Sequence, residues 1–518
     1  MSELGFWRLA TEDPGAVALH LPDGSHVTRG ELHERSNQIV HGLRALGLEP
    51  GDSIAAVQPN GLAMMEIYFA ALQAGWRLTP INHHLVGPEI AYVVDDSEAK
   101  FAIVHERFAD TVTAARRESS LDDDRWLSVG HIDGFRDWGE VPDGQPTTPP
   151  DDRNAGAAMH YTSGTTGRPK GVRRALFDID PDDMAGLLTG LQAMFGIGPD
   201  DGNVAICGSP LYHTAPLMWF GSAFHLGHPA VLMDKWDPVR MMELIDEHHV
   251  TWSHLVPTQF HRLLQAIPPD RRGEYDVSSL RAMVHAAAPC PPDVKRQMIE
   301  WWGDSIWEYY AATEGGGTII SAAEWLKKPG SVGLPWPNSD IRILDDQHQD
   351  VPTGEEGTIY MLSMAEFEYK GDKAKTEANR VDGYFTVGDW GYLDSDGYLF
   401  LKDRRSDLIL SGGVNIYPAE IEGALLGIET VDDAAVFGIP HEDWGQEIKA
   451  VIQPVDLSIV GDPTAEAELT ADILAALTET LAKFKHPRTI DLITEMPRDP
   501  SGKLFKRKLR DPYWADQG

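Results

Sequence analysis

The stretch Tyr161-Thr162-Ser163-Gly164-Thr165-Thr166-Gly167-Arg168-Pro169-Lys170-Gly171-Val172 is the most informative part of the chain. It follows the apolar run Ala157-Ala158-Met159 and combines hydroxyl side chains, glycines and one lysine. A turn of this composition brings backbone N–H and side-chain O–H groups to one point, which is a common way for proteins to bind an anion. Glycine allows the backbone to approach such an anion closely. The residue order differs from that of a Walker P-loop, which requires G-x-x-x-x-G-K followed by Ser or Thr.

Length and composition set the general class of protein. A chain of 518 residues is too long for one ordinary hydrophobic core, so we expect two or more domains. The hydrophobic share of 42% is typical of a globular protein. The formal net charge is −36, from 44 basic and 80 acidic residues. A surface this acidic repels nucleic acid and anionic lipid, so we expect neither as a partner.

Cysteine content and apolar runs indicate the compartment. The chain has two cysteines, Cys207 and Cys290, which could pair but are too few for a disulfide scaffold and favour a reducing compartment. Residues 1–10 contain no basic region followed by an apolar run, so we expect no signal peptide. No apolar run reaches the roughly eighteen residues that cross a bilayer. We therefore predict a cytoplasmic protein without an integral membrane segment.

Hydrophobic periodicity predicts alternating helices and strands in the first part of the chain. The expected helices are 32–46 and 63–74, and the expected strands are 53–57, 76–81 and 101–104. This alternation is typical of a parallel sheet covered by helices. The polar segment 105–155 is expected to be variable surface that ends in a connector. Near the C-terminus, the expected strands 431–436 and 448–455 and the helix 469–481 predict a small α+β domain.

Further motifs follow the anion-binding stretch in a fixed order. They are Ser209-Pro210-Leu211-Tyr212-His213-Thr214-Ala215-Pro216, His285-Ala286-Ala287-Ala288-Pro289, Trp307-Glu308-Tyr309-Tyr310-Ala311-Ala312-Thr313-Glu314-Gly315 and Tyr384-Phe385-Thr386-Val387-Gly388-Asp389. The last ones are Asp403-Arg404-Arg405-Ser406-Asp407, Ser411-Gly412-Gly413-Val414-Asn415 and Pro497-Arg498-Asp499-Pro500-Ser501-Gly502-Lys503. Together with the anion-binding stretch, this series closely resembles the motifs of the acyl-adenylate-forming enzymes, which include acyl-CoA and aryl-CoA ligases, firefly luciferase and the adenylation domains of peptide synthetases.

The resemblance covers nearly the whole chain and implies its fold and domains. It implies an α/β protein with a large N-terminal domain, 1–405, built of α/β subdomains plus a small β-barrel. A small, mobile α+β domain, 406–518, would carry the catalytic lysine. Ser406 stands where the family usually has Asp or Lys as the hinge, and Ser can absorb the backbone rotation that a hinge needs.

The resemblance also implies how nucleotide and Mg²⁺ are bound. The residues expected to bind ATP or AMP are Thr162, Ser163, Gly164, Thr165, Thr166, Gly167, Lys170, Ala286, Ala287, Ala288, Tyr310, Asp389 and Arg404. Tyr310 would stack on adenine, and Asp389 and Arg404 would hold the ribose. Thr313 would contact the α-phosphate and Glu314 would bind Mg²⁺, which prefers hard carboxylate oxygens. The family usually has Gly where this chain has Ala286 and Ala311.

The remaining site residues concern the acid and the thiol. The expected catalytic residues are Lys503, Thr313, Glu314 and His213, and the expected acyl pocket contains Met218, Trp219, Ala311 and Gly315. Gly412 and Gly413 would flank the CoA tunnel. The segment after His213 is apolar and carries no carboxylate, which favours a hydrophobic acid without an amino group. The glycines Gly315-Gly316-Gly317 are expected to open the pocket.

These expectations predict an ATP-dependent acyl-CoA synthetase that uses ATP, Mg²⁺ and CoA. It would convert a fatty acid, or an acid that resembles a steroid side chain, to an acyl-adenylate and then to a thioester. Two alternatives remain open: transfer to the phosphopantetheine of a carrier protein, and an inactive sensor that binds nucleotide or acyl-CoA. A degenerate sensor would be expected to lack Lys503 or Glu314, and both are present. A homodimer is compatible with the sequence, which leaves the oligomeric state open.

Overall fold

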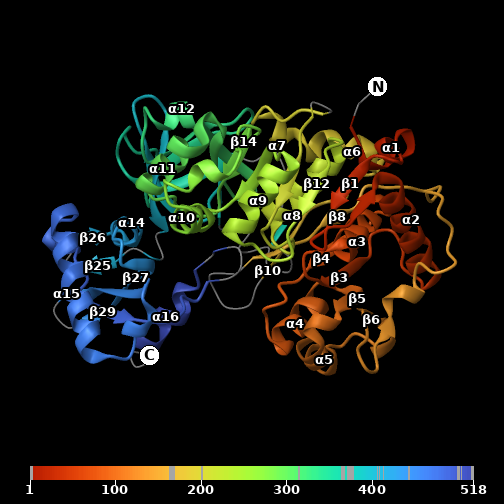
Figure 1. The fold of residues 1–518 in the computed structure, drawn as a ribbon, viewed down its shortest axis with the longest axis horizontal. Helices are drawn as coiled ribbons and strands as arrows, with labels where there is room; N and C mark the ends of the chain where they lie inside the picture. The colour runs from red at the N-terminus through yellow and green to blue at the C-terminus, as the bar shows by residue number, and fades with distance from the viewer. Residues whose placement is uncertain are drawn as a thin grey trace. The chain divides into compact units, whose positions relative to one another are not determined.

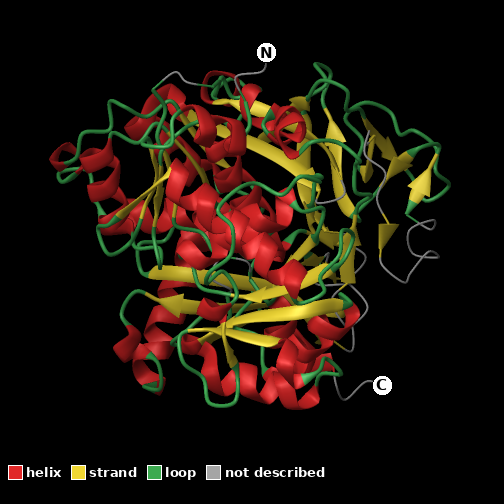
Figure 2. Ribbon diagram, turned by 90° about the vertical axis from the view of Figure 1, so that its right-hand side faces the viewer, coloured by secondary structure: helices red, strands yellow, loops and turns green. Residues whose placement is uncertain are grey.

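The structure is a computed structural model that describes residues 4–162, 170–199, 202–312, 315–362, 368–369, 379–404, 407, 409–411, 414–441, 444–498, 502 and 504–514. The chain divides into two compact units. The first contains Met1–Leu255, Ala266–Val284 and Ala365–Ala378, and the second contains Val256–Gln265, His285–Met364 and Asn379–Gly518. Figure 1 follows the chain through both units, and Figure 2 shows strands gathered in layers with helices packed on them.

The first unit contains a parallel sheet with the strand order β7-β6-β5-β3-β4-β8. Its strands are β3 (Ser53–Val57), β4 (Arg77–Pro80), β5 (Ala99–His105), β6 (Trp126–Val129), β7 (Arg136–Asp137) and β8 (Ala157–Ala158). The helices around it are α2 (Arg29–Ala45), α3 (Leu62–Gln73), α4 (Gly87–Asp96) and α5 (Ala109–Glu118). Ile90 and Val94 of α4 and Val112 of α5 share one buried cluster with Ala55 and Val104 of the sheet. The predicted parallel sheet covered by helices is therefore confirmed.

A second set of strands in this unit runs in the order β2-β1-β12-β11-β13-β14. These strands are β1 (Val17–His20), β2 (His26–Thr28), β11 (Ala205–Cys207), β12 (Ala230–Leu232), β13 (Trp252–Leu255) and β14 (Ala282–His285). The accompanying helices are α1 (Phe6–Glu12), α6 (Pro181–Leu188), α7 (Gly190–Ala193), α8 (Thr214–His225) and α9 (Pro238–His248). A third, small sheet joins β9 (Tyr161–Thr162), β10 (Lys170–Arg173) and β20 (Glu368–Tyr369) in the order β20-β10-β9.

Two predictions in this unit differ from the structure. The helix expected at 32–46 begins at Arg29, because Thr28 and Glu31 form a capping box: the Thr28 hydroxyl accepts from the Glu31 amide at 3.2 Å, and the Glu31 carboxylate accepts from the Thr28 amide at 2.8 Å. The polar segment 105–155 is more than variable surface. Its strand β6 is buried and pairs in parallel with β5, so this segment extends the core of the sheet.

The second unit begins with antiparallel strands in the order β15-β16-β17-β24-β23-β19-β22-β21, with β18 paired to β19. They are β15 (Ile306–Ala312), β16 (Gly315–Ser321), β17 (Ser331–Pro335), β18 (Ile341–Leu344), β19 (Gly357–Leu362), β21 (Arg380–Val381), β22 (Tyr384–Phe385), β23 (Asp389–Leu393) and β24 (Leu399–Arg404). Helices α10 (Pro257–Ala266), α11 (Pro292–Trp302) and α12 (Ala322–Trp325) belong to the same unit. These strands are the β-rich part of the protein, where the small barrel was expected.

The C-terminal part of this unit is a sheet between two helical layers. Its strands are β25 (Ile409–Ser411), β26 (Val414–Ile416), β27 (Val431–His441), β28 (Gly445–Pro454) and β29 (Thr489–Leu492), and its helices are α14 (Pro418–Leu426), α15 (Pro463–Thr480) and α16 (Lys506–Trp514). One apolar cluster joins the sheet to α14 and α15 through Ile421, Leu425 and Ile473. A second cluster joins Phe437 to Leu509 of α16. Figure 1 shows this region in blue, and it confirms the predicted α+β character of the C-terminus.

Candidate active site

The anion-binding stretch lies on a β-hairpin. Strands β9 and β10 pair antiparallel, with Lys170 opposite Thr162 and Gly171 opposite Tyr161. Ser163, Gly164, Thr165, Thr166 and Gly167 lie outside the described residues, but the pairing fixes both ends of the loop that contains them. The Tyr161 hydroxyl donates to the Asp96 carboxylate at 2.6 Å, which anchors the hairpin. A Cβ on Gly171 would lie 3.1 Å from the Tyr161 ring, so this position favours glycine.

The segment Ala286-Ala287-Ala288 follows β14 directly, as predicted for an adenine-supporting segment. Ala286 is buried, whereas Ala287 and Ala288 are exposed. Ala287 has φ of 74°, in the left-handed region that costs a non-glycine residue about 1–2 kcal/mol. Backbone strain of this kind persists only where the surrounding structure fixes it, and it is frequent at binding sites. A strained and exposed residue therefore lies just after this strand, in the segment expected to support adenine.

Tyr310 and Asp389 are brought together although they are far apart in the sequence. The Tyr310 hydroxyl, at the end of β15, donates to the Asp389 carboxylate at the start of β23 at a distance of 2.7 Å. Asp389 also stands directly opposite Arg404 in the antiparallel pair of β23 and β24. Gly388, with φ of 84°, makes the turn that leads into Asp389, and only glycine adopts this angle without strain. The side chains of Tyr310 and Asp389 thus meet, and the backbone of Arg404 lies beside Asp389.

The hairpin of β15 and β16 carries the second motif. Thr313 and Glu314 lie outside the described residues, between Ala312 and Gly315. Ala311 stands opposite Gly317 in the hairpin, and both Ala311 and Gly315 are partly exposed. Gly317 does not open a pocket as expected, because a Cβ there would lie 2.3 Å from the Tyr310 carbonyl oxygen and 2.7 Å from the Trp336 ring. The same holds for Gly316, whose added Cβ would lie 2.9 Å from the Leu362 carbonyl oxygen. These two glycines are required by close strand packing.

Two of the predicted acyl-pocket residues, Met218 and Trp219, lie on helix α8, whereas Ala311 and Gly315 lie on the hairpin of β15 and β16. His213 precedes the helix, is partly exposed and has its ring 4.5 Å from that of Tyr212. Met218 is partly exposed, whereas Trp219 is buried among aromatic rings, with centroids 5.2 Å from Phe195 and 5.5 Å from His254. Trp219 therefore packs in the core of the first unit, and Met218 has the accessible side chain of the two.

The lysine motif is anchored by an arginine that the sequence analysis did not single out. Lys503, Ser406, Gly412 and Gly413 lie outside the described residues. Gly502, which precedes Lys503, accepts a hydrogen bond on its carbonyl oxygen from the Arg498 Nη1 at 2.7 Å. Arg498 also forms a bidentate pair with Asp433 of β27, at 2.5 Å and 2.7 Å. The available signal was a basic residue within the motif 497–503, four positions before Gly502.

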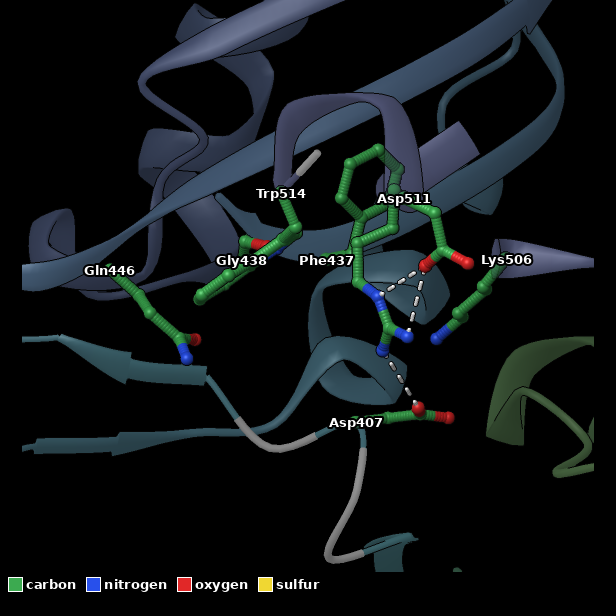
Figure 3. Close-up of a pocket in the computed structure, with 8 residues that line it drawn as sticks. Asp407, Phe437, Gly438, Gln446, Lys506, Asp511 and Trp514 are labelled. Atoms are coloured by element: carbon green, nitrogen blue, oxygen red, sulfur yellow. Dashed lines mark hydrogen bonds and ion pairs between the residues drawn. The ribbon is translucent and has the colours of Figure 1, made fainter. Parts of the chain in front are cut away.

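A pocket of about 220 Å³ lies in the C-terminal part of the second unit. Asp407, Lys506 and Asp511 point toward one another there (Figure 3). Lys506 pairs with Glu422 at 2.8 Å, and Arg510 pairs with Asp407 at 3.8 Å and with Asp511 at 3.2 Å. Because both cations already have carboxylate partners, the pocket lacks the excess of positive charge that an anionic ligand needs.

The remaining features are the two thiols, the groups that could bind a metal ion, and the helices that could cross a membrane. Cys207 and Cys290 are free thiols, and burial raises the pKa of each. Within the described residues, no cluster of three or more His, Cys, Asp or Glu side chains could hold a metal ion. No helix in the part of the chain that the structure describes has both the length and the apolar character needed to cross a membrane.

Comparison with known proteins shows the family. The model of the AMP-binding enzyme family matches residues 6–365, and that of the AMP-binding enzyme C-terminal domain matches residues 420–503. A fatty acid–[acyl-carrier-protein] ligase of Streptomyces coeruleorubidus is 31% identical, with 98% of this chain and 95% of the relative covered. A feruloyl-CoA synthase of an Amycolatopsis species is 33% identical, with 98% of both chains covered.

Solved structures agree with this result. The o-succinylbenzoate CoA synthetase of Bacillus subtilis, in complex with its acyl-adenylate intermediate, superposes with a TM-score of 0.79 at 26% identity over 98% of both chains. ATP-bound MatB of Rhodopseudomonas palustris superposes with a TM-score of 0.79 at 28% identity over 99% of both chains. The chain therefore belongs to the AMP-binding enzyme family and is an AMP-forming acid–thiol ligase.

Proposed function

We propose that this enzyme activates a hydrophobic carboxylic acid with Mg·ATP and transfers the acyl group to CoA. The observation that carries the proposal is the convergence of Tyr310, Asp389 and Arg404. A phenol ring offers a face on which adenine can stack, and a carboxylate beside it can accept hydrogen bonds from both ribose hydroxyls. We assign the second contact to the ribose to Arg404, which stands opposite Asp389 in the pair of β23 and β24.

In the first step, a carboxylate oxygen of the acid attacks the α-phosphorus of ATP. The bond from that phosphorus to the bridging oxygen breaks, which releases pyrophosphate and leaves the acyl-adenylate. Negative charge grows on the phosphoryl oxygens and on the leaving group, so catalysis rests on positioning and electrostatic stabilisation. We assign this stabilisation to Lys503, Thr313, the loop 163–169 with Lys170, and a Mg²⁺ ion held by Glu314 and the phosphates.

The apolar character of helix α8 supports a hydrophobic acid. Between His213 and Phe220 the helix carries no carboxylate that could pair with an amino group, and Met218 is a partly exposed apolar side chain there. Three of the relatives named above act on fatty, ferulic and succinylbenzoic acids, none of which has an α-amino group. A fatty acid or an acid with a bulky apolar ring, such as a steroid side chain, is the class that we propose.

A stacked surface group in the C-terminal part of the second unit supports CoA as the acceptor. The Trp444 ring stacks on His441, with centroids 4.4 Å apart and planes at 8°, and the Arg488 guanidinium lies 4.3 Å from the centre of the same ring. Trp444 is 37% exposed. An exposed indole beside a guanidinium suits a nucleobase and its phosphates, both of which CoA carries.

In the second step, the thiol sulfur attacks the acyl carbonyl carbon, AMP leaves and a thioester forms. A free thiol has a pKa of about 8.5, so only a few per cent is thiolate at neutral pH, but a mixed anhydride is reactive enough for this attack. We propose that a rotation near Ser406 withdraws Lys503 and brings Gly412 and Gly413 beside the thiol, and that His213 borders the same passage. The boundary at 405/406 and a homodimer remain predictions, and size-exclusion chromatography with light scattering tests the latter.

Transfer to a carrier protein is the second candidate function. It is favoured by the fatty acid–[acyl-carrier-protein] ligase that is 31% identical over nearly the whole chain. Both acceptors present a phosphopantetheine thiol, but only CoA brings an adenine nucleotide to the surface around Trp444.

Pyrophosphate release from Mg·ATP tests the proposal. The assay is run with a panel of carboxylic acids, each without acceptor, with CoA and with a phosphopantetheinylated carrier protein. Turnover with one apolar class of acid that depends on CoA supports the proposal. Turnover only with the carrier protein favours the second candidate, and no release with any acid favours a nucleotide-binding sensor.

A further inference from the structure

A buried ion pair lies behind the proposed adenine site. Lys295 of α11 is fully buried, and its Nζ donates to Glu308 Oε2 of β15 at 2.5 Å. The ammonium group also lies 5.0 Å from the centre of the Trp325 ring. Burial raises the pKa of Glu308, and the charge of Lys295 opposes that shift. Two buried charges carry a large desolvation cost, and apolar residues of the same size often serve stability as well or better.

The pair connects the two segments expected to enclose adenine, which are 286–288 and the strand β15 that carries Tyr310. On one side, His285 is the last residue of β14 and leads directly into Ala286–Ala288, and its Nε2 lies 3.8 Å from the same Glu308 oxygen. The segment then enters α11, where Lys295 holds that oxygen from the other end. A single carboxylate therefore contacts residues on both sides of the alanine segment.

Glu308 belongs to the strand that forms the opposite wall. It precedes Tyr310 by two residues in β15, and side chains two apart in a strand share one face of the sheet. Tyr310 is fixed at its far end by the hydrogen bond to Asp389. The position of Tyr310 relative to the alanine segment is thus set by Glu308 on one side and by Asp389 on the other.

We propose that Lys295, Glu308 and His285 form a positioning cluster that fixes the distance between Ala286–Ala288 and Tyr310, and so sets the affinity for the adenine ring. The cluster acts through these residues and does not touch the nucleotide. The inference rests on the proposed function only in taking adenine as the ligand of this site. Stacking contacts weaken steeply when a gap opens by about 0.5–1 Å, so small displacements of either wall reduce binding. The strained φ of Ala287 is the kind of geometry that such a cluster would hold in place.

The test compares AMP binding by calorimetry in the wild type and in the double variant K295M/E308M. Removing both charges avoids a stranded buried ion, so we expect the melting temperature to be retained. We expect the dissociation constant of AMP to rise about tenfold, since loss of fixed geometry at a distance from the ligand can weaken a site by this much or more. In turnover, KM for ATP should rise while KM for the acid stays unchanged, a split that a general loss of stability would not produce.

A matched control is R153M/D182N, which removes a similar pair in the first unit, 2.8 Å long and with Asp182 only 4% exposed. Its AMP affinity should equal that of the wild type. If K295M/E308M does not fold, E308Q keeps the size of the side chain and should weaken AMP binding in the same direction. Wild-type AMP affinity in a folded K295M/E308M or E308Q variant overturns the inference. Because AMP binding needs neither acid nor acceptor, an enzyme that binds AMP but activates no acid refutes the proposed function alone.

Discussion

The anchor of the lysine motif provides the most discriminating prediction. Arg498 donates to the carbonyl oxygen of Gly502, whose next residue in the chain is Lys503, and its bidentate pair with Asp433 ties it to β27. A charge-assisted hydrogen bond contributes about 1.5–3 kcal/mol, and about 1.4 kcal/mol is a factor of ten. If Lys503 acts only in acyl-adenylate formation, loss of its anchor should slow that half-reaction by about 10–100-fold.

The variant must not leave a buried charge behind. Asp433 is 7% exposed, and breaking a buried pair by removing one partner costs about 3–5 kcal/mol of stability. We therefore choose R498M/D433N, in which the side-chain amide oxygen at position 433 can still accept from the Ala434 amide, as the Asp433 carboxylate does at 2.8 Å. Acyl-adenylate formation is followed by pyrophosphate release in single turnovers. The second half-reaction is followed from synthetic acyl-adenylate and CoA, and its rate should stay within about twofold of the wild type if the pair acts only through Lys503.

A double-mutant cycle with K503A completes the test. In the K503A background, R498M/D433N should cause no further loss of adenylation, because the residue through which it acts is already gone. R498K keeps the positive charge but loses the bidentate geometry of the guanidinium, so its adenylation rate should lie between those of the wild type and R498M/D433N. Equal slowing of both half-reactions, or an additive loss in the K503A background, would refute the reasoning.

Other predictions address the remaining parts of the molecule. The wild type should prefer ATP to 2′-deoxy-ATP by about 10–100-fold in kcat/KM, since a hydrogen bond to a carboxylate contributes about 1.5–3 kcal/mol. D389A should lose this preference, and a D389A variant that still prefers ATP would disprove the ribose contact. W444A should raise KM for CoA without changing acyl-adenylate formation, and an unchanged KM would exclude the stacked surface as a CoA site. A287G should raise the free energy of unfolding by about 1 kcal/mol, because it relieves the positive φ; chemical denaturation measures the change, and a loss of stability would contradict it. Burial lowers the pKa of His225 from 6.5 to about 4. Its contribution to stability is therefore complete above pH 6.5, and about 3 kcal/mol is lost as the pH falls toward 4. H225N should make the unfolding free energy less dependent on pH in this range, and the same pH dependence as in the wild type would count against the assignment.

Much of the fold follows from short-range signals in the sequence. The strand 53–57 is predicted to the residue, because an unbroken small apolar run after Gly51-Asp52 has few other conformations that bury it. Strand β6 is not predicted, since Trp126–Val129 is short and lies between acidic and glycine-rich turns whose polarity dominates the segment. Strand β27 extends to His441, beyond the predicted end at residue 436, because pairing with β28 overrides the breaking tendency of Gly438 and Pro440.

The site is predictable to the extent that its residues belong to motifs. Tyr310 and Asp389 are both expected at one nucleotide, and the structure brings them into hydrogen-bonding contact across 79 positions. Pocket shape is less predictable. The expectation that Gly316 and Gly317 open a cavity is wrong, because each glycine is closely approached by atoms that local sequence does not reveal: the Leu362 carbonyl oxygen at Gly316, and the Tyr310 carbonyl oxygen and the Trp336 ring at Gly317.

The charge pairs that support the site lie beyond the reach of the sequence for a different reason. With 80 acidic residues, nothing local indicates that Glu308 pairs with Lys295 or that Asp433 pairs with Arg498. Removing a lysine or arginine from solvent carries a desolvation cost that its ion pair must offset. Lys295 is fully buried and Arg498 is partly buried, and each lies one contact away from a motif: Lys295 behind the segment 286–288, and Arg498 behind Gly502. Loss of either ion pair should therefore have kinetic effects similar to the loss of a motif residue. Only measurements that separate AMP binding, adenylation and thioester formation can distinguish the ion pair from the motif residue that it positions.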